Sequence, residues 1–341
     1  MTGATGSADR AVLCGLGYFL PDRVVTNTQL CERLDVSEDW IEGRTGISRR
    51  RWVEPGEATS DLAVEAGRAA LKSAGSGLVD AVVLATTTPD YRCPATAPDV
   101  AARLGLSGVA AFDVSAVCTG FVYGLATAAG FIAAGFAERV LLIAAEAFST
   151  LLDPDDRTTQ PIFGDGAGAV VLRRGRADEP GAIGPLVLGS DGDRSELITV
   201  KAGGSRLPFR VPAPDDGSQY FQMRGREVFR QSVERMSAAA AEALEAAGWQ
   251  LSDVDRVVTH QANARVSAAL ATRLGLRRDA VTQNIADVGN TAAASIPVLL
   301  AQAASNGTLE PGHRVLLAAF GGGLTWGATT LTWPELEVHD T

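Results

Sequence analysis

The chain has 341 residues, 46% of them hydrophobic and 21% charged, which is enough to bury a large core and to form two domain-sized units. Its net charge of -10 argues against binding to the phosphate backbone of nucleic acids. The four cysteines and three histidines have no metal-ligand spacing, which argues against a structural zinc site.

The first residues give no sign of a targeting segment. Residues 1–10 are rich in Gly, Ser, Ala and Thr and lack the apolar core of a signal peptide. We therefore expect a flexible tail on a cytoplasmic protein whose thiols stay reduced. Residues 114–137 carry no charge and are long enough to cross a bilayer. Because this stretch is rich in Ala and Gly and has acidic flanks, we interpret it as a buried helix and expect no membrane partner.

Short, β-branched apolar runs indicate that the chain is a duplication. Such runs begin at Asp80 and Arg139, and again at Asp255 and Arg314, and each predicts a buried strand. Both pairs are 59 residues apart (139 − 80 and 314 − 255), and each pair encloses an uncharged, Ala-rich helix, at 118–137 and 290–304. We therefore predict two copies of one unit, at residues 11–180 and 181–341. Alternating elements of this kind form mostly parallel sheets covered by helices, with the uncharged helices between the copies.

Reactive side chains occur at corresponding places in the two copies. Cys118 lies where the first uncharged helix begins, and unpaired N–H groups and the helix dipole favour a thiolate there. His260 ends the strand that begins at Asp255, and Asn290 lies at the turn that we equate with the Cys118 turn. Ligand sites form at such strand ends in open α/β sheets. Taken alone, Cys118 is as well explained as an inert buried cysteine, and His260 as a structural histidine.

Glycines follow the last predicted strand of the second copy. Residues 321–323 are all glycine and lie between apolar residues, unlike a polar flexible loop. Bare backbone N–H groups of this kind suit an oxyanion hole.

Six segments in order resemble the β-ketoacyl-acyl carrier protein synthase III family of thiolase-like condensing enzymes. The resemblance covers essentially the whole chain after the tail. It implies a thiolase-like duplicated α/β fold with α-β-α-β-α layers, a homodimer, and an acyltransferase that needs no metal or redox cofactor. The segments are residues 37–47 (SEDWIEGRTGI), 113–120 (DVSAVCTG), 163–168 (FGDGAG), 260–263 (HQAN), 289–291 (GNT) and 320–327 (FGGGLTWG).

The resemblance also implies a reaction. An acyl-CoA starter is joined to malonyl-acyl carrier protein by decarboxylative Claisen condensation, which initiates fatty-acid or polyketide synthesis. Cys118 carries the acyl group, and His260 and Asn290 donate hydrogen bonds to the enolate. Backbone N–H groups of Cys118 and Gly322 form the oxyanion hole.

The implied CoA site lies at the mouth of a tunnel. Trp40 offers a flat face to the adenine, and Arg44 offers a charge to the phosphates. Arg157 helps from the other side of the adenine, and Gly225 and Asn263 line the pantetheine arm.

The implied acyl pocket consists of Cys93, Phe163 and Phe320. Cys93 comes from segment 87–97 of the partner chain in the homodimer. In acetyl-using members a phenylalanine occupies the place of Cys93. A smaller side chain deepens the pocket, so we predict starters longer or bulkier than acetyl.

Carrier proteins are acidic, so an acidic enzyme must offer them a local basic patch. We expect this docking surface at Gln261, Ala262, Asn263, Ala264, Arg265 and Arg224. A solvated helix face is the alternative reading of these arginines.

Two other functions are open. The first is a relative that moves an acyl group to a hydroxyl or amine without forming a carbon–carbon bond, against which the pair His260 and Asn290 argues. The second is a non-catalytic subunit that shapes its partner's pocket, against which Cys118 argues.

Overall fold

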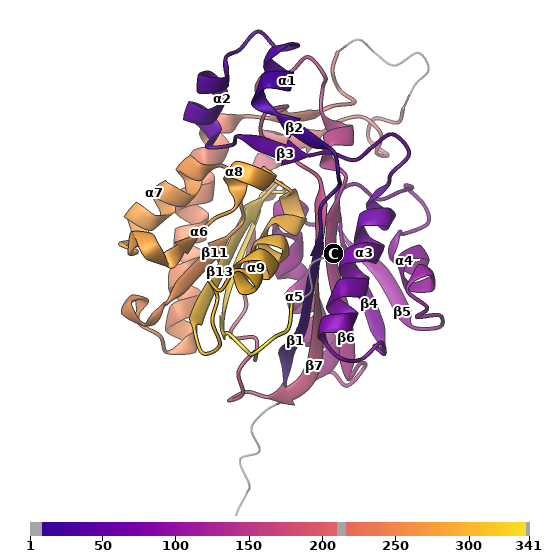
Figure 1. Cartoon of the computed structure of the whole chain (residues 1–341), viewed down its shortest axis with the longest axis vertical. Coiled ribbons are helices and arrows are strands. Elements are labelled where there is room, and N and C mark those ends of the chain that lie inside the picture. Colours follow the sequence, from indigo (N-terminus) through magenta and orange to yellow (C-terminus); the bar gives the residue numbers. More distant parts are fainter. Residues whose placement is uncertain (1–8, 210–215, 339–341) are drawn as a thin grey trace, which may run out of the picture.

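The computed structural model describes residues 9–209 and 216–338, which form two five-stranded sheets facing each other across a shared layer of helices (Figure 1). The order of the first sheet is β1 (Asp9–Phe19), β7 (Gly166–Arg176), β6 (Arg139–Glu146), β4 (Ala81–Ala85) and β5 (Ala110–Val114). The order of the second is β8 (Val187–Ser190), β14 (Thr325–Thr332), β13 (Arg314–Gly321), β11 (Arg256–Thr259) and β12 (Val281–Thr282).

The two sheets have the same pairing pattern, which confirms the duplication. In each described sheet the strand that follows the first long helix, β4 or β11, pairs in parallel with both neighbours. The other two pairings in each sheet are antiparallel. Since β1 and β8 are antiparallel to β7 and β14, which are themselves antiparallel to β6 and β13, four of the five strands in each sheet run in the same direction. The sheets are thus mostly parallel, as expected, and β7 and β14 are the strands that run the other way.

Helices form three layers around these sheets. Helices α3 (Thr59–Ser73) and α4 (Ala97–Arg103) cover the outer face of the first sheet, and α6 (Gly225–Ala247) and α7 (Ala264–Leu274) cover that of the second (Figure 1). The uncharged helices α5 (Gly120–Ala133) and α9 (Ser295–Ser305) lie between the sheets and share one apolar core with strands of both. Within residues 9–209 and 216–338, no helix is long and apolar enough to cross a membrane.

Shorter elements lie around one end of the sheets. They include the helices α1 (Asn27–Cys31), α2 (Glu38–Thr45) and α8 (Ile285–Val288). They also include the strand pairs β2 (Val24–Thr26) with β3 (Arg49–Arg51), and β9 (Ile198–Val200) with β10 (Phe221–Met223).

The predicted tail and domain boundary can be compared with the observed strands. Of the predicted tail, residues 1–8 lie outside the described residues, but Asp9 and Arg10 begin β1 and pair with β7, so the tail as predicted was too long. The predicted division between residues 180 and 181 falls in the connection between β7 and β8.

The turns that open the two central helices correspond to each other. Val117 and Ala292 each start a 3₁₀ turn, with left-handed φ angles of 47° and 45°. They are 292 − 117 = 175 residues apart, the same separation as Arg139 and Arg314. The equivalent of Cys118 is therefore Ala293, and not Asn290 as we inferred from the pattern.

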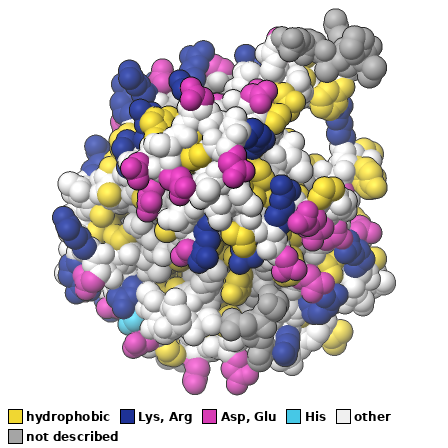
Figure 2. Space-filling view, turned by 45° about the horizontal axis from the view of Figure 1, so that its top comes forward, with side chains coloured by type: hydrophobic (Ala, Val, Ile, Leu, Met, Phe, Trp, Pro, Cys, Tyr) yellow, Lys and Arg dark blue, Asp and Glu magenta, His cyan; other side chains and the backbone are white. Residues whose placement is uncertain are grey.

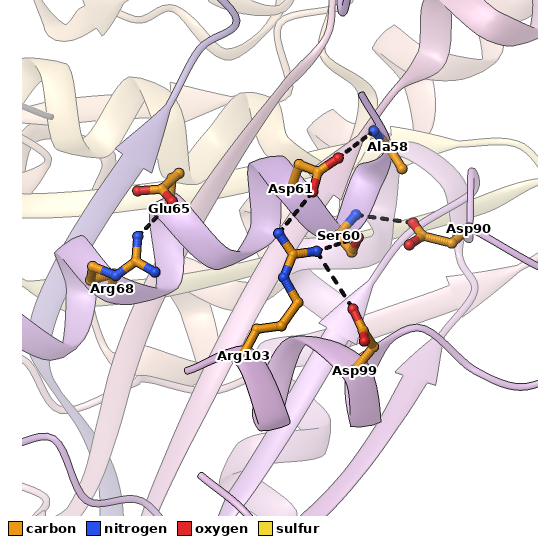
Figure 3. A network of polar contacts seen from close by, with 8 residues as sticks. All are labelled: Ala58, Ser60, Asp61, Glu65, Arg68, Asp90, Asp99 and Arg103. Carbon is orange, nitrogen blue, oxygen red and sulfur yellow. Dashed lines mark hydrogen bonds and ion pairs between the residues drawn. The ribbon is translucent and has the colours of Figure 1, made fainter. Parts of the chain in front are cut away.

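A polar network fixes the segment between β4 and α4. Arg103 donates to the Ser60 hydroxyl at 2.9 Å and pairs with Asp61 at 2.8 Å and Asp99 at 3.5 Å (Figure 3). Asp90, within the segment, accepts the Ser60 N–H at 3.0 Å. The segment that carries Cys93 is thereby tied to α3 and α4.

Candidate active site

A cavity of about 480 Å³ lies where the two halves meet, and Cys118, His260 and Asn290 all line it. Cys118 comes from the turn before α5, His260 follows β11, and Asn290 precedes the turn before α9. The duplicated fold thus brings together three side chains that are far apart in the sequence.

Cys118 is buried in its turn, with 8% of its surface exposed. Its neighbour Thr119 shares a hydrogen bond of 2.6 Å with the hydroxyl of Thr325, which in turn donates to the Gly322 carbonyl at 2.9 Å. Burial raises the pKa of the Cys118 thiol, and the Glu146 carboxylate raises it further, while a backbone hydrogen bond acts in the opposite direction. Desolvation is the largest of these effects, and it favours the neutral thiol.

The glycine turn packs directly on the Cys118 turn. A Cβ atom at Gly321 would lie 2.9 Å from the Cys118 backbone nitrogen and 3.0 Å from that of Thr119. Gly322 is buried, and a Cβ atom there would lie 3.1 Å from the side chain of Ile198 and 3.3 Å from that of Val117. Since real Cβ atoms do not approach so closely, glycine at 321 is what lets β13 end against the Cys118 turn.

His260 is buried and neutral. Its Nδ1 atom lies 2.7 Å from the hydroxyl of Ser295, and its backbone N–H donates to the Ala318 carbonyl. Burial lowers the pKa of His260 to about 3, and a backbone contact with Ala292 opposes this only weakly. An uncharged imidazole can serve as a hydrogen-bond donor through one ring nitrogen.

Asn290 has a fixed side-chain orientation. Its Oδ1 accepts the Ala292 N–H at 2.9 Å, and its amide N–H is 3.5 Å from the Ala262 carbonyl. Its backbone pairs on both sides with the segment around Phe163. The amide nitrogen retains a second N–H for a ligand.

Most of the residues expected to bind CoA lie at this cavity. Arg44, Gly225 and Asn263 line it, and the Arg44 guanidinium stacks 4.4 Å above the ring of Trp40. The Asn263 side chain caps α7 and donates to the Arg44 carbonyl at 3.1 Å. Arg157 is exposed and does not line the cavity.

The residues expected to dock a carrier protein are only partly accessible. Gln261 is 0% exposed and bonds to the Thr259 carbonyl, so its assignment to a docking surface was wrong. Ala262, Asn263 and Ala264 are half-buried, whereas Arg224 and Arg265 are exposed. Basic and acidic side chains are interspersed over the face seen in Figure 2.

Aromatic rings form one wall of the cavity. Phe163 and Phe320 line it as expected, together with Phe221. Phe148 stacks on Phe163 at 4.3 Å between ring centroids, and Phe221 meets both rings edge-on. Cys93 is exposed and does not line the cavity of its own chain.

Sequence reasoning missed other residues of this region. Glu146 is fully buried at the end of β6, where it accepts the Thr87 N–H at 3.0 Å and the Thr88 hydroxyl at 3.2 Å. Its position as the lone charge after a long apolar run is a signal that was available in the sequence. Ser295 had no comparable signal, because it is one small polar residue in an Ala-rich helix.

The described residues hold no group of three or more His, Cys, Asp and Glu side chains suited to a metal ion. All four cysteines lie within the described residues and are free.

Comparison with known proteins identifies the family. Residues 112–192 match the family described as 3-oxoacyl-[acyl-carrier-protein (ACP)] synthase III, and residues 244–333 match its C-terminal part. A Streptomyces coelicolor protein named beta-ketoacyl-[acyl-carrier-protein] synthase III 3 is 58% identical over 330 residues, which span 96% of this chain and 98% of that protein. This chain belongs to the β-ketoacyl-acyl carrier protein synthase III family.

Solved structures of synthase III proteins agree with the fold. The crystal structure of 3-oxoacyl-(acyl carrier protein) synthase III, FabH, from Pseudomonas aeruginosa superposes with a TM-score of 0.91 at 49% identity, covering 96% of this chain and 99% of that one. The priming β-ketosynthase of the R1128 polyketide pathway gives a TM-score of 0.88 at 35% identity, covering 98% and 99%. The thiolase-like fold expected from the sequence is thereby confirmed.

Proposed function

We propose that this synthase III protein condenses an acyl-CoA starter with malonyl-acyl carrier protein, with loss of carbon dioxide. The observation that carries the proposal is the convergence of one thiol and two neutral hydrogen-bonding side chains, Cys118, His260 and Asn290, on a single cavity beside a glycine turn. Family membership supports the same reaction.

In the first step Cys118 takes the acyl group. Its sulfur attacks the thioester carbonyl of acyl-CoA, the carbon–sulfur bond to CoA breaks, and the proton lost by the Cys118 thiol is balanced by the one gained by CoA. The oxyanion that forms is stabilised by the backbone N–H groups of Cys118 and Gly322. One such donor typically lowers the activation free energy by about 2.7–4 kcal/mol.

In the second step malonyl-carrier protein loses carbon dioxide and becomes an enolate. The enolate oxygen accepts hydrogen bonds from His260 Nε2–H and the Asn290 amide, and neither group has to gain or lose a proton. The carbanion attacks the acyl group on Cys118, a carbon–carbon bond forms, and the Cys118 sulfur leaves and is protonated. The chemistry needs no cofactor.

Arg44 and Trp40 support the entry of CoA. Their stacked pair presents a cation and a flat ring at the mouth of the cavity, and Gly225 and Asn263 line its wall. A guanidinium suits phosphate, and an indole suits adenine. We propose that Arg157 contacts the adenine from outside this cavity.

The acyl pocket is completed by a second copy of the chain. Cys93 is exposed within the segment between β4 and α4, which the network of Figure 3 holds at Asp90, and this suits a contact made across a homodimer. The small thiol then faces the end of the acyl chain, so we propose starters longer or bulkier than acetyl. Acyl-CoA use and unpaired cysteines suit a cytoplasmic enzyme.

Mass spectrometry of the intact protein after exposure to a panel of acyl-CoAs tests the first step. The wild type should gain the mass of the acyl group, located on Cys118 by peptide mapping, and Cys118→Ala should gain none. Acylation of Cys118→Ala at another cysteine would show that the nucleophile is misassigned.

A further inference from the structure

The imidazole of His260 has one side-chain partner. Ser295, the first residue of α9, is 2% exposed, and its Oγ lies 2.7 Å from Nδ1 of His260. The backbone N–H of Gln261 donates to the same Oγ at 3.3 Å. One buried hydroxyl thus contacts both residues that follow β11.

The direction of the Ser295–His260 bond follows from counting donors. A hydroxyl has one hydrogen to donate, and the Gln261 N–H already occupies one of its lone pairs. A buried hydroxyl hydrogen needs an acceptor. Among the described residues, the acceptor found within hydrogen-bonding distance of Ser295 Oγ is His260 Nδ1. Ser295 therefore donates to Nδ1, and the neutral ring carries its own hydrogen on Nε2.

We propose that Ser295 is a positioning residue that fixes His260 in the Nε2–H tautomer, so that the ring acts as a hydrogen-bond donor in the cavity. The proposal rests on the proposed function, because it is the enolate that needs the donor. In the other tautomer Nε2 would turn a lone pair toward a negatively charged oxygen, and one of the two donors would be lost. Loss of one such donor typically slows a reaction by about 10²–10³-fold.

The role of Ser295 is separate from that of Cys118. Ser295 does not line the cavity, and it bonds to neither Cys118 nor the glycine turn. Acyl loading uses the thiol and backbone N–H groups, so it does not depend on the tautomer of His260. Removal of the hydroxyl should therefore slow decarboxylation and spare loading.

Ser295→Ala tests this with two independent readouts. With ¹⁵N-labelled histidine, the sequence gives three imidazoles, and His260→Ala assigns the one of interest. The wild type should show a protonated Nε2 and an unprotonated Nδ1, and Ser295→Ala should lose this fixed pattern. Carbon dioxide release from malonyl-carrier protein should fall by roughly 10²- to 10³-fold, with acyl loading within about twofold of the wild type.

Ser237→Ala is the matched control, since Ser237 is also buried but donates within its own helix to the Val233 carbonyl at 2.6 Å. It should change neither readout. An unchanged tautomer and unchanged carbon dioxide release in Ser295→Ala would overturn the proposal, as would a parallel loss of loading and release, which indicates a general structural role. A wild type that shows the Nε2–H tautomer but releases no carbon dioxide would refute the condensation and leave the tautomer assignment standing.

Discussion

At the residue scale, the buried titratable groups around the cavity are kept uncharged by their surroundings. Desolvation is the largest cause of the pKa shift for Cys118, Glu146 and His260 alike, and in each case it favours the neutral form. It raises the pKa of Glu146 to about 8, although several hydrogen bonds to the carboxylate act against it. A neutral interior suits a reaction in which the charge appears on the substrate's oxygen.

This burial predicts a pH dependence of stability. The pKa of Glu146 is higher in the folded than in the unfolded protein. The contribution of Glu146 to stability is therefore fully present below about pH 4.5 and is lost as the pH rises through about 8. Glu146→Gln keeps the shape and removes the ionisation. Between pH 5 and pH 9 the melting temperature of the wild type should therefore fall by several degrees relative to Glu146→Gln.

Thermal denaturation at several pH values measures this difference. Glu138→Gln, at an exposed carboxylate just before the same strand, should follow the wild type at every pH. A constant gap between wild type and Glu146→Gln from pH 5 to pH 9 would mean that Glu146 does not titrate in this range.

At the element scale, activity depends on how closely β13 approaches the turn before α5. Gly321→Ala would force the Cys118 backbone to move, because the new Cβ would lie only 2.9 Å from the Cys118 backbone nitrogen. Acyl loading should fall at least tenfold, and overpacking of this kind costs about 1–3 kcal/mol of stability. Gly130→Ala in α5 is the control, since its Cβ meets open space. It should be neutral or stabilise the helix by up to about 1 kcal/mol. Equal loading rates in the two variants would contradict this view of the turn.

The repeated elements are also what the sequence predicted best. Four strands were predicted correctly from the apolar runs at Asp80, Arg139, Asp255 and Arg314. The equal spacing of these runs also predicted the duplication. The register of the second turn was misjudged. The separation of 175 residues between corresponding strands already leads from Cys118 to Ala293, and the left-handed φ of Ala292 agrees with it.

Features that depend on pairing across the fold were less accessible to sequence reasoning. Strand β7 contains three arginines and β14 contains four threonines, yet this composition does not reveal that the two strands run antiparallel to their neighbours. Gln261 is polar and adjacent to an exposed helix, yet its amide satisfies backbone groups in the interior. Ser295 is one small polar residue in an Ala-rich run, and its partner His260 is 35 residues away.

At the scale of the whole molecule, an acidic protein has to meet an acidic carrier through a local surface. Arg224 is exposed at the start of α6, next to cavity-lining Gly225, and no side-chain bond caps the helix there. Arg224→Glu should raise KM for malonyl-carrier protein several-fold, most strongly at low salt, with little change in acyl-CoA loading. Arg68→Glu, on the exposed side of α3, is the control and should alter neither. An equal loss for both substrates would place Arg224 in the CoA site instead.

We expect the dimer to determine which acyl-CoA starter the enzyme prefers, because the partner chain lines the acyl pocket. Light scattering at micromolar concentration should show a dimer, and Cys93→Phe should shift preference from hexanoyl- or butyryl-CoA toward acetyl-CoA. Burial of each methylene is worth about 0.8 kcal/mol, so two or three carbons shift kcat/KM by about one to two orders of magnitude. Tyr91→Ala, two residues away and exposed, should leave the preference unchanged. A monomer, or a wild type that prefers acetyl-CoA, would contradict the proposed pocket.

The central claim is that the three converging residues divide a condensation between loading and decarboxylation. The most direct measurement is the release of labelled carbon dioxide from malonyl-carrier protein by protein already acylated on Cys118. We predict that the wild type releases label and forms the 3-oxoacyl product in equal amounts. His260→Ala and Asn290→Ala should load normally but release label at least 10²-fold more slowly. An acylated wild type that passes its acyl group to a hydroxyl or amine without releasing label would show that the protein does not catalyse the condensation.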